Sequence, residues 1–195
     1  MTSIVFAGTG GQGVITISYI IGKAAVHEGK NVLMTELHGM AQRGGKIAVE
    51  LRIGDYRSSI IPMGTADALV AFEEMEAMRN SGKLREGGIV LVNRRKIHPV
   101  TLIRRAEDYP DELVQDFLGK IKATMIDADE IAVGLGNKRT VNVVMLGALF
   151  STGILGLGKE SILSAIRESL GEKNFDVNSR AFEAGQRKME IARAA

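Results

Sequence analysis

The sequence contains no cysteine and no tryptophan, and it has only three prolines and three histidines. Without thiolates the chain can form no disulfide and can supply no ligand to an iron–sulfur cluster. Three scattered histidines also argue against a histidine-rich metal site. We therefore expect this chain to hold no metal by itself.

Aromatic residues make up only 5% of the chain, and its formal net charge is +2. So few stacking side chains and so weak a charge argue against a nucleic-acid partner. The longest apolar run, VNVVMLGALF at residues 141–150, is about half the length of a membrane span. The first residues lack the basic start of a signal peptide. We expect a soluble, cytoplasmic protein with no nucleic-acid or membrane partner.

What the 195 residues do contain is an ordinary globular composition, 45% hydrophobic and 25% charged. A β-branched run at 3–7 predicts a buried strand, and apolar spacing of three and four predicts a helix over 14–28. A second strand is predicted over 31–36. This order predicts a right-handed crossover and a parallel pair of strands.

The next segment departs from a nucleotide-binding fold. Residues 37–45 read as a loop, 46–54 alternate as a strand, and 58–62 read as its return strand, with no helix before them. The α/β rhythm then returns. Strands are predicted at 66–72, 87–93 and 121–128, and helices at 73–82, 111–119, 140–152, 160–171 and 176–194.

This pattern predicts an α/β fold with a mostly parallel, Rossmann-like sheet, an antiparallel hairpin and a helical C-terminal third. We expect a single domain over 1–195, with the sheet core at about 1–130 and the C-terminal helices at about 138–195.

The stretch FAGTGGQGV at residues 6–14 joins the first strand to the first helix. Gly8, Gly10 and Gly13 fit G-x-G-x-x-G, and Gly11 adds a fourth glycine. Free N–H groups and the dipole at a helix start favour an anion. Glu36 stands about where an acidic residue would bind a ribose hydroxyl. Three interpretations stay open: a dinucleotide site, a phosphate or cofactor contact shared with a partner, and a tight turn alone.

A second loop, ELHGMAQRGG at 36–45, follows the next strand. Because the carboxyl ends of parallel strands share one edge of a sheet, His38, Gln42 and Arg43 are expected near the first loop. Histidine can exchange a proton near neutral pH, and arginine offers a rigid fork for a carboxylate or phosphate. The alternative is a surface loop with a solvated arginine.

Four separated stretches together resemble one family. GTGGQGV, HGMAQRGG, NVVMLGAL and NSRAFEAG occur in that order between about residues 4 and 186. They resemble the gamma module of the 2-oxoacid:ferredoxin oxidoreductases, and the second stretch is most similar to the small (beta) subunits of the indolepyruvate type.

The resemblance implies a complex that oxidatively decarboxylates a 2-oxoacid, here an arylpyruvate, forms an acyl-CoA and reduces ferredoxin. It implies that thiamine diphosphate, Mg²⁺, iron–sulfur clusters and coenzyme A belong to the complex, mainly to a large partner subunit. This chain would hold no cofactor alone and be inactive alone. Its sequence lacks the G-D-G motif of a thiamine site. Self-association of the isolated chain stays open.

The resemblance also selects site residues. It assigns a first edge loop of Gly10, Gly11, Gln12 and Gly13, and a second of Gln42, Arg43, Gly44 and Gly45. Asn142 would point its amide at the same edge, or else cap a helix. His38 and Arg43 are the candidate catalytic residues, with Arg43 facing a CoA phosphate or a partner carboxylate.

Two other functions remain as alternatives: a free-standing NAD(P)-binding Rossmann protein and a non-catalytic interaction module of the same fold. A basic cluster, Arg94, Arg95 and Lys96, fits CoA phosphates, an acidic ferredoxin or a solvated loop.

Overall fold

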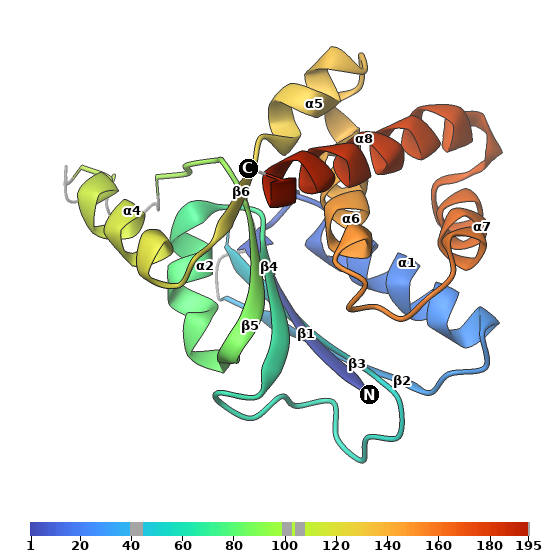
Figure 1. Cartoon of the computed structure of the whole chain (residues 1–195), viewed down its shortest axis with the longest axis horizontal. Coiled ribbons are helices and arrows are strands. Elements are labelled where there is room, and N and C mark those ends of the chain that lie inside the picture. Colours follow the sequence, from blue (N-terminus) through green and yellow to red (C-terminus); the bar gives the residue numbers. More distant parts are fainter. Residues whose placement is uncertain (40–44, 99–102, 104–107, 195) are drawn as a thin grey trace.

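The computed structural model describes residues 1–39, 45–98, 103 and 108–194. It contains a six-stranded sheet in the order β2-β3-β1-β4-β5-β6 (Figure 1). The strands are β1 (Thr2–Thr9), β2 (Val32–His38), β3 (Lys46–Ile53), β4 (Ala66–Ala71), β5 (Leu84–Asn93) and β6 (Thr124–Ile126).

Strands β1, β4, β5 and β6 run parallel to one another, whereas β3 is antiparallel to both β1 and β2. The predicted fold class is therefore confirmed. One pairing is wrong: β1 and β2 are not neighbours, because β3 lies between them. Ile47, Val49, Leu51 and Ile53 alternate along β3 and join the core on one face. All eight residues of β3 pair with β1. Strand β3 therefore joins the antiparallel hairpin of β2 and β3 to the main sheet.

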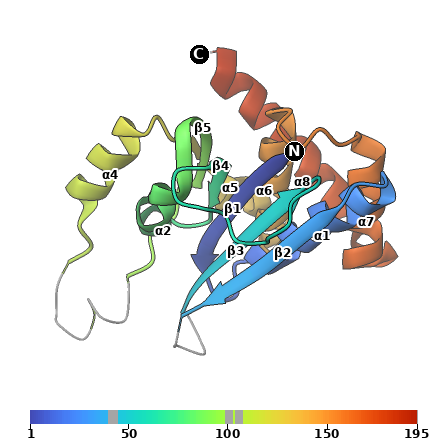
Figure 2. The ribbon, with the colours of Figure 1, turned by 90° about the horizontal axis from the view of Figure 1, so that it is seen from below.

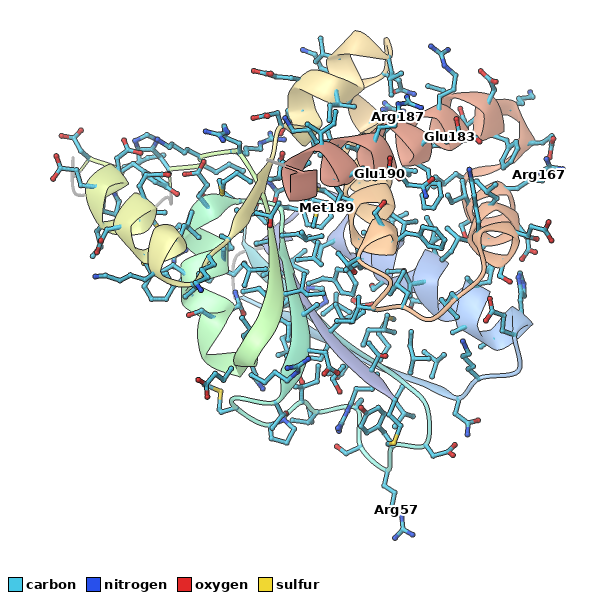
Figure 3. All side chains as sticks on the ribbon, in the orientation of Figure 1. Arg57, Arg167, Glu183, Arg187, Met189 and Glu190 are labelled. Atoms are coloured by element: carbon cyan, nitrogen blue, oxygen red, sulfur yellow. The ribbon has the colours of Figure 1, made fainter. Side chains whose placement is uncertain are left out.

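The predicted return strand at 58–62 is also wrong, since these residues adopt no strand. Side chains of other segments form hydrogen bonds with the backbone of Ile61 instead. The Ile61 N–H donates to the buried Glu50 carboxylate, and Lys83 Nζ donates to the Ile61 carbonyl at 2.6 Å. Lys83 also pairs with Glu50 at 2.9 Å. This connection thus packs on the sheet without joining it, while Arg57 extends outward from it (Figure 3).

Two helical layers cover the sheet. On one face lie α1 (Val14–His27), α6 (Val141–Ser151), α7 (Lys159–Leu170) and α8 (Phe175–Ala194), and on the other lie α2 (Glu74–Asn80) and α4 (Asp111–Lys120) (Figure 2). These match predicted helices within a few residues. The helix α5 (Ala128–Gly134) was not predicted. A separate apolar core lies under each layer.

Helix α6 is buried on both sides. It packs against α8 so closely that a Cβ added to Gly147 would lie 1.9 Å from the Phe182 carbonyl oxygen. The reciprocal position, Gly185, would place a Cβ 2.0 Å from the Val144 carbonyl oxygen. Only glycine permits this approach, and it fixes where the start of α6 meets the sheet.

No helix in the described ranges combines the length and apolar character that crossing a membrane requires.

Candidate functional site

The loop between β1 and α1 places backbone N–H groups at the start of a long helix. Gly11 and Gly13 adopt positive φ angles of 92° and 81°. Gly13 caps the 14-residue helix α1, and no side chain of a described residue accepts from the first helical N–H groups. Unpaired donors at a helix start, together with the helix dipole, favour an anion.

Gln12 braces this loop from inside. Its Oε1 accepts a hydrogen bond from the Thr9 N–H at 2.6 Å, and its Nε2 donates to the Phe72 carbonyl at 3.0 Å. Both ends of the amide are therefore bonded to backbone. In this structure Gln12 holds the loop in shape and ties β1 to the end of β4.

Asn142 lies directly beside this loop, as the motif match predicts. It is the second residue of α6 and is 7% exposed. Its Nδ2 would lie 2.8 Å from a Cβ added to Gly13. The Oδ1 accepts from the Val143 N–H at 3.0 Å, whereas the Nδ2 has no acceptor among the described residues. The starts of α1 and α6 thus meet at Gly13 and Asn142.

A cavity of about 610 Å³ opens at this meeting point. Its wall combines Gly11–Gly13, Arg95 after β5, the turn 137–140 before α6, and Asn174 and Asn178 near the start of α8. Among the described residues, three cationic side chains line it and no carboxylate does. Two helix starts and three cations make this cavity suited to a phosphate-bearing ligand.

Lys138 and Arg139 supply the part of this positive charge that forms no ion pair with a described residue. Asn137 Oδ1 holds the turn by accepting from the Arg139 N–H at 3.0 Å. Motif matching missed both cations. The signal for them was local: a basic pair stands between an amide residue that caps a turn and the start of a long apolar helix.

The second predicted loop contacts the first through its last residue. The Gly10 N–H donates to the Gly45 carbonyl at 3.0 Å. Gln42, Arg43 and Gly44 lie outside the described residues, so their predicted place at this edge stays a prediction.

His38 is not brought to the cavity. Its Nε2 lies 2.9 Å from Glu36 Oε2, and it lines a separate groove of about 290 Å³ with Arg79 and Asn80 of α2. The physical reason is the sheet order. Because β3 separates β2 from β1, the end of β2 is displaced by two inter-strand spacings, roughly 9–10 Å.

The same displacement weakens the dinucleotide interpretation. In a dinucleotide-binding fold the ribose carboxylate comes from the strand beside β1. Here that place belongs to β3, and Glu36 is paired with His38 one strand farther away. The glycine loop is present, but the carboxylate that would complete the fingerprint is not beside it.

Two residues of the basic cluster after β5 form ion pairs away from the cavity, and the third lines it. Arg94 pairs with Asp127 at 2.9 Å, and Lys96 pairs with Asp111. A hydrogen bond from Lys188 lowers the pKa of Asp127, and Arg94 lowers it further. The hydrogen bond to Asp111 raises the pKa of Lys96. Only Arg95 of these three lines the cavity.

Sequence reasoning also missed a buried carboxylate, Glu73, on the other face. It caps α2 through the Glu76 N–H at 2.9 Å and accepts from the Tyr109 hydroxyl at 2.7 Å and the Ile97 N–H at 3.2 Å. Burial and this bond to Glu73 raise the pKa of Tyr109, so the phenol stays protonated. Glu73 thereby holds together two segments flanking residues 98–108.

With this geometry established, comparison with known proteins identifies the family. Residues 3–188 match the family described as pyruvate ferredoxin/flavodoxin oxidoreductase. The chain belongs to this family. Its resemblance to gamma-type modules is confirmed by both sequence and structure.

Among its relatives, indolepyruvate oxidoreductase subunit IorB of Methanothermobacter thermautotrophicus is 43% identical over 188 residues, covering 94% of this chain and 95% of that protein. The pyruvate/ketoisovalerate oxidoreductases common subunit gamma of Thermococcus kodakarensis is 32% identical over 190 residues, covering 93% and 96%. The keto/oxoacid ferredoxin oxidoreductase gamma subunit of Geobacter sulfurreducens superimposes with a TM-score of 0.72 at 27% identity, covering 98% and 99%.

Proposed function

We propose that this chain is the small, gamma-type subunit of a 2-oxoacid:ferredoxin oxidoreductase that acts on arylpyruvates such as indolepyruvate. The observation that carries the proposal is the 43% identity to an IorB subunit over 95% of that subunit's length. The complex would oxidatively decarboxylate the 2-oxoacid, form an acyl-CoA and pass electrons to ferredoxin.

The residues of this chain support assigning the cofactors of the complex to another subunit. A chain with no cysteine supplies no thiolate to an iron–sulfur cluster. No group of three or more His, Asp or Glu side chains that could hold a metal occurs in the described part of the chain. We assign the clusters, the thiamine diphosphate and its Mg²⁺ to a large partner subunit in the cytoplasm. This subunit then contributes binding and orientation.

For the cavity, we propose the phosphate groups of coenzyme A as occupant. The N–H groups of Gly11–Gly13 and the start of α6 would face these phosphates, and Arg95, Lys138 and Arg139 would pair with them. The Asn142 amide N–H₂, which has no acceptor among the described residues, lies at the same wall. Coenzyme A would supply the thiol that takes up the acyl group, while these residues bind and orient its charged end.

Arg43 keeps its proposed role toward an anionic group, on the motif alone. Replacing it with alanine should reduce turnover of the complex without unfolding this subunit.

A tagged purification from the native host tests the subunit assignment. We expect a large, iron-rich partner in the eluate, bound thiamine diphosphate, and arylpyruvate-dependent reduction of ferredoxin. A colourless protein that elutes alone would contradict a stable complex, and tight NAD binding by that protein would favour the dinucleotide alternative instead.

A further inference from the structure

A buried polar network links the ends of three strands behind the cavity. The Phe72 carbonyl, just after β4, accepts from Gln12 Nε2 at 3.0 Å and from Asn93 Nδ2 at 3.4 Å. Gln12 belongs to the glycine loop after β1, and Asn93 is the last residue of β5. One carbonyl oxygen therefore connects the loop that caps α1 to the end of β5.

Asn93 is completely buried, and every polar atom of its side chain is bonded. Its Oδ1 accepts from the Ala128 N–H at 3.1 Å, at the first residue of α5. Its Nδ2 donates to Asp129 Oδ2 at 2.7 Å. A buried amide with such partners is held in one orientation, because breaking any of these bonds would leave a polar atom without a partner.

Asp129 connects the buried Asn93 to the wall of the cavity. Its Oδ2 is held by Asn93, and its Oδ1 accepts from Arg95 Nη1 at 3.0 Å. The two carboxylate oxygens are thus divided between a buried anchor and an arginine that lines the cavity. Arg94, one residue earlier, pairs with Asp127, whose second oxygen contacts Lys188 and not a buried amide.

We infer that Asp129, anchored by the buried Asn93, is a positioning residue that fixes the guanidinium of Arg95 in the anion cavity. This inference rests on the proposed function of the cavity. An unrestrained arginine samples many rotamers, and that freedom is lost when a ligand binds. Holding the guanidinium in place beforehand removes part of that loss.

Asp129 also carries a negative charge beside the cavity, so its removal has two opposing effects. Loss of positioning weakens anion binding, whereas loss of the charge strengthens it. The sign of the change in affinity therefore separates a positioning role from a role in balancing the charge of Arg95.

The experiment measures binding of desulfo-coenzyme A, which lacks the reactive thiol, to the assembled complex by calorimetry. Arg95→Ala should raise its Kd about tenfold, as expected for one lost charge-assisted contact. Asp129→Ala and Asn93→Ser should each raise the Kd several-fold. In the Arg95→Ala background, Asp129→Ala should change the Kd by less than about twofold, because its effect passes through Arg95.

Turnover gives a second readout that a purely structural role would not move. Asp129→Ala should raise the KM for coenzyme A, with little change in kcat at saturating coenzyme A or in the KM for the 2-oxoacid. Asp127→Ala, which removes the partner of Arg94, is the matched control and should leave the Kd unchanged. If Asn93→Ser does not fold, the cycle between Asp129 and Arg95 still decides the inference.

Two outcomes would overturn it in distinguishable ways. An unchanged or lower Kd in Asp129→Ala, with a raised Kd in Arg95→Ala, rejects the positioning role and leaves the cavity assignment intact. An unchanged Kd in Arg95→Ala rejects both the cavity as the phosphate site and the positioning of Arg95 within it.

Discussion

Two openings lie beside the ends of strands in this subunit, and they differ in charge. The cavity at Gly13 and Asn142 is lined by the starts of α1 and α6 and by Lys138 and Arg139, which have no ion-pair partner among the described residues. The groove at His38 contains similar residue types, yet a carboxylate, that of Glu76, lines it together with the cations Arg79 and Lys46. His38 pairs with Glu36, and Arg79 pairs with Glu76.

Residue type alone therefore does not make an anion site. Both openings contain basic side chains and adjoin glycine-containing loops. Only the first adds the N–H groups at the starts of two long helices, α1 after β1 and α6 after the turn 137–140. Strand β2 is followed by a hairpin, and its end therefore offers no helix dipole.

Moving α6 tests this contrast most severely, since the helix forms one wall of the cavity and lines no part of the His38 groove. Gly147→Ala would place a Cβ 1.9 Å from the Phe182 carbonyl oxygen and push α6 from α8. We expect the free energy of unfolding to fall by about 3 kcal/mol, measured by chemical denaturation.

Gly119→Ala in α4 is the control for that substitution, since nothing lies within 4 Å of its added Cβ. It should be neutral or stabilise by up to about 1 kcal/mol. Equal denaturation midpoints for the two variants would contradict the close packing of α6 on α8.

A second test acts on the cavity from the loop. Gly13→Ala introduces a side chain at a φ of +81°, where it is strained, and places its Cβ against the Asn142 side chain. It should lower the free energy of unfolding by about 1–3 kcal/mol and raise the Kd for desulfo-coenzyme A. Gly29→Ala, at a φ of +69° with nothing within 4 Å, is the matched control. It should lower stability through backbone strain and leave the Kd unchanged. An equal rise in Kd in both variants would contradict the assignment of the cavity as the binding site.

A third test sharpens the contrast in charge. Lys138→Ala and Arg139→Ala should each raise the Kd for desulfo-coenzyme A about fivefold, because each removes a partly solvated cation from the cavity. Added salt should reduce these differences. His38→Ala and Arg79→Ala should leave the Kd unchanged. Loss of affinity in the His38 variant, without loss in the Lys138 variant, would reverse the assignment of the two openings.

The smallest expected effect concerns the paired part of the basic cluster. The folded-state pKa of Asp127 is lowered from 3.8, first by the hydrogen bond from Lys188. Its stabilising contribution is therefore present above pH 3.8 and is lost as the pH falls through the lower folded-state value.

Asp127→Asn should lower the melting temperature slightly at neutral pH and make the acid side of the stability profile less steep. Thermal unfolding between pH 7 and pH 3 measures this. A melting temperature that differs equally from the wild type at all pH values would contradict the assignment. The Kd for desulfo-coenzyme A should stay constant, in contrast to Asp129→Ala.

Much of the secondary structure could be predicted because its signals are local. Apolar spacing along α1, α7 and α8 and alternation along β3 predict these elements within a few residues. The place of β3 in the sheet could not be predicted, because a strand that alternates in this way fits either next to β2 alone or between two strands. The connection over 58–62 looked like a strand because its isoleucines are apolar. The hydrogen bond from the Ile61 N–H to the Glu50 side chain holds it against the face of the sheet instead of in the strand ladder.

The candidate site divides in the same way. The four motifs predicted that Asn142 lies at the glycine loop, and the structure places its amide beside Gly13. They did not predict Lys138, Arg139 or the proposed role of Asp129, because these residues come close to the cavity only through the folding of the segments before α6 and at the start of α5.

By itself, the sequence determined that this chain supplies no cysteine ligand, that a glycine loop starts its first helix and that it resembles a gamma-type subunit. These are properties of composition and of short segments. The tertiary structure alone decided which polar groups share the cavity. Strand order places β3 between β1 and β2 and takes His38 away, while the close packing at Gly147 and Gly185 sets α6 beside Gly13. Such proximity depends on contacts between distant segments, which no local pattern encodes.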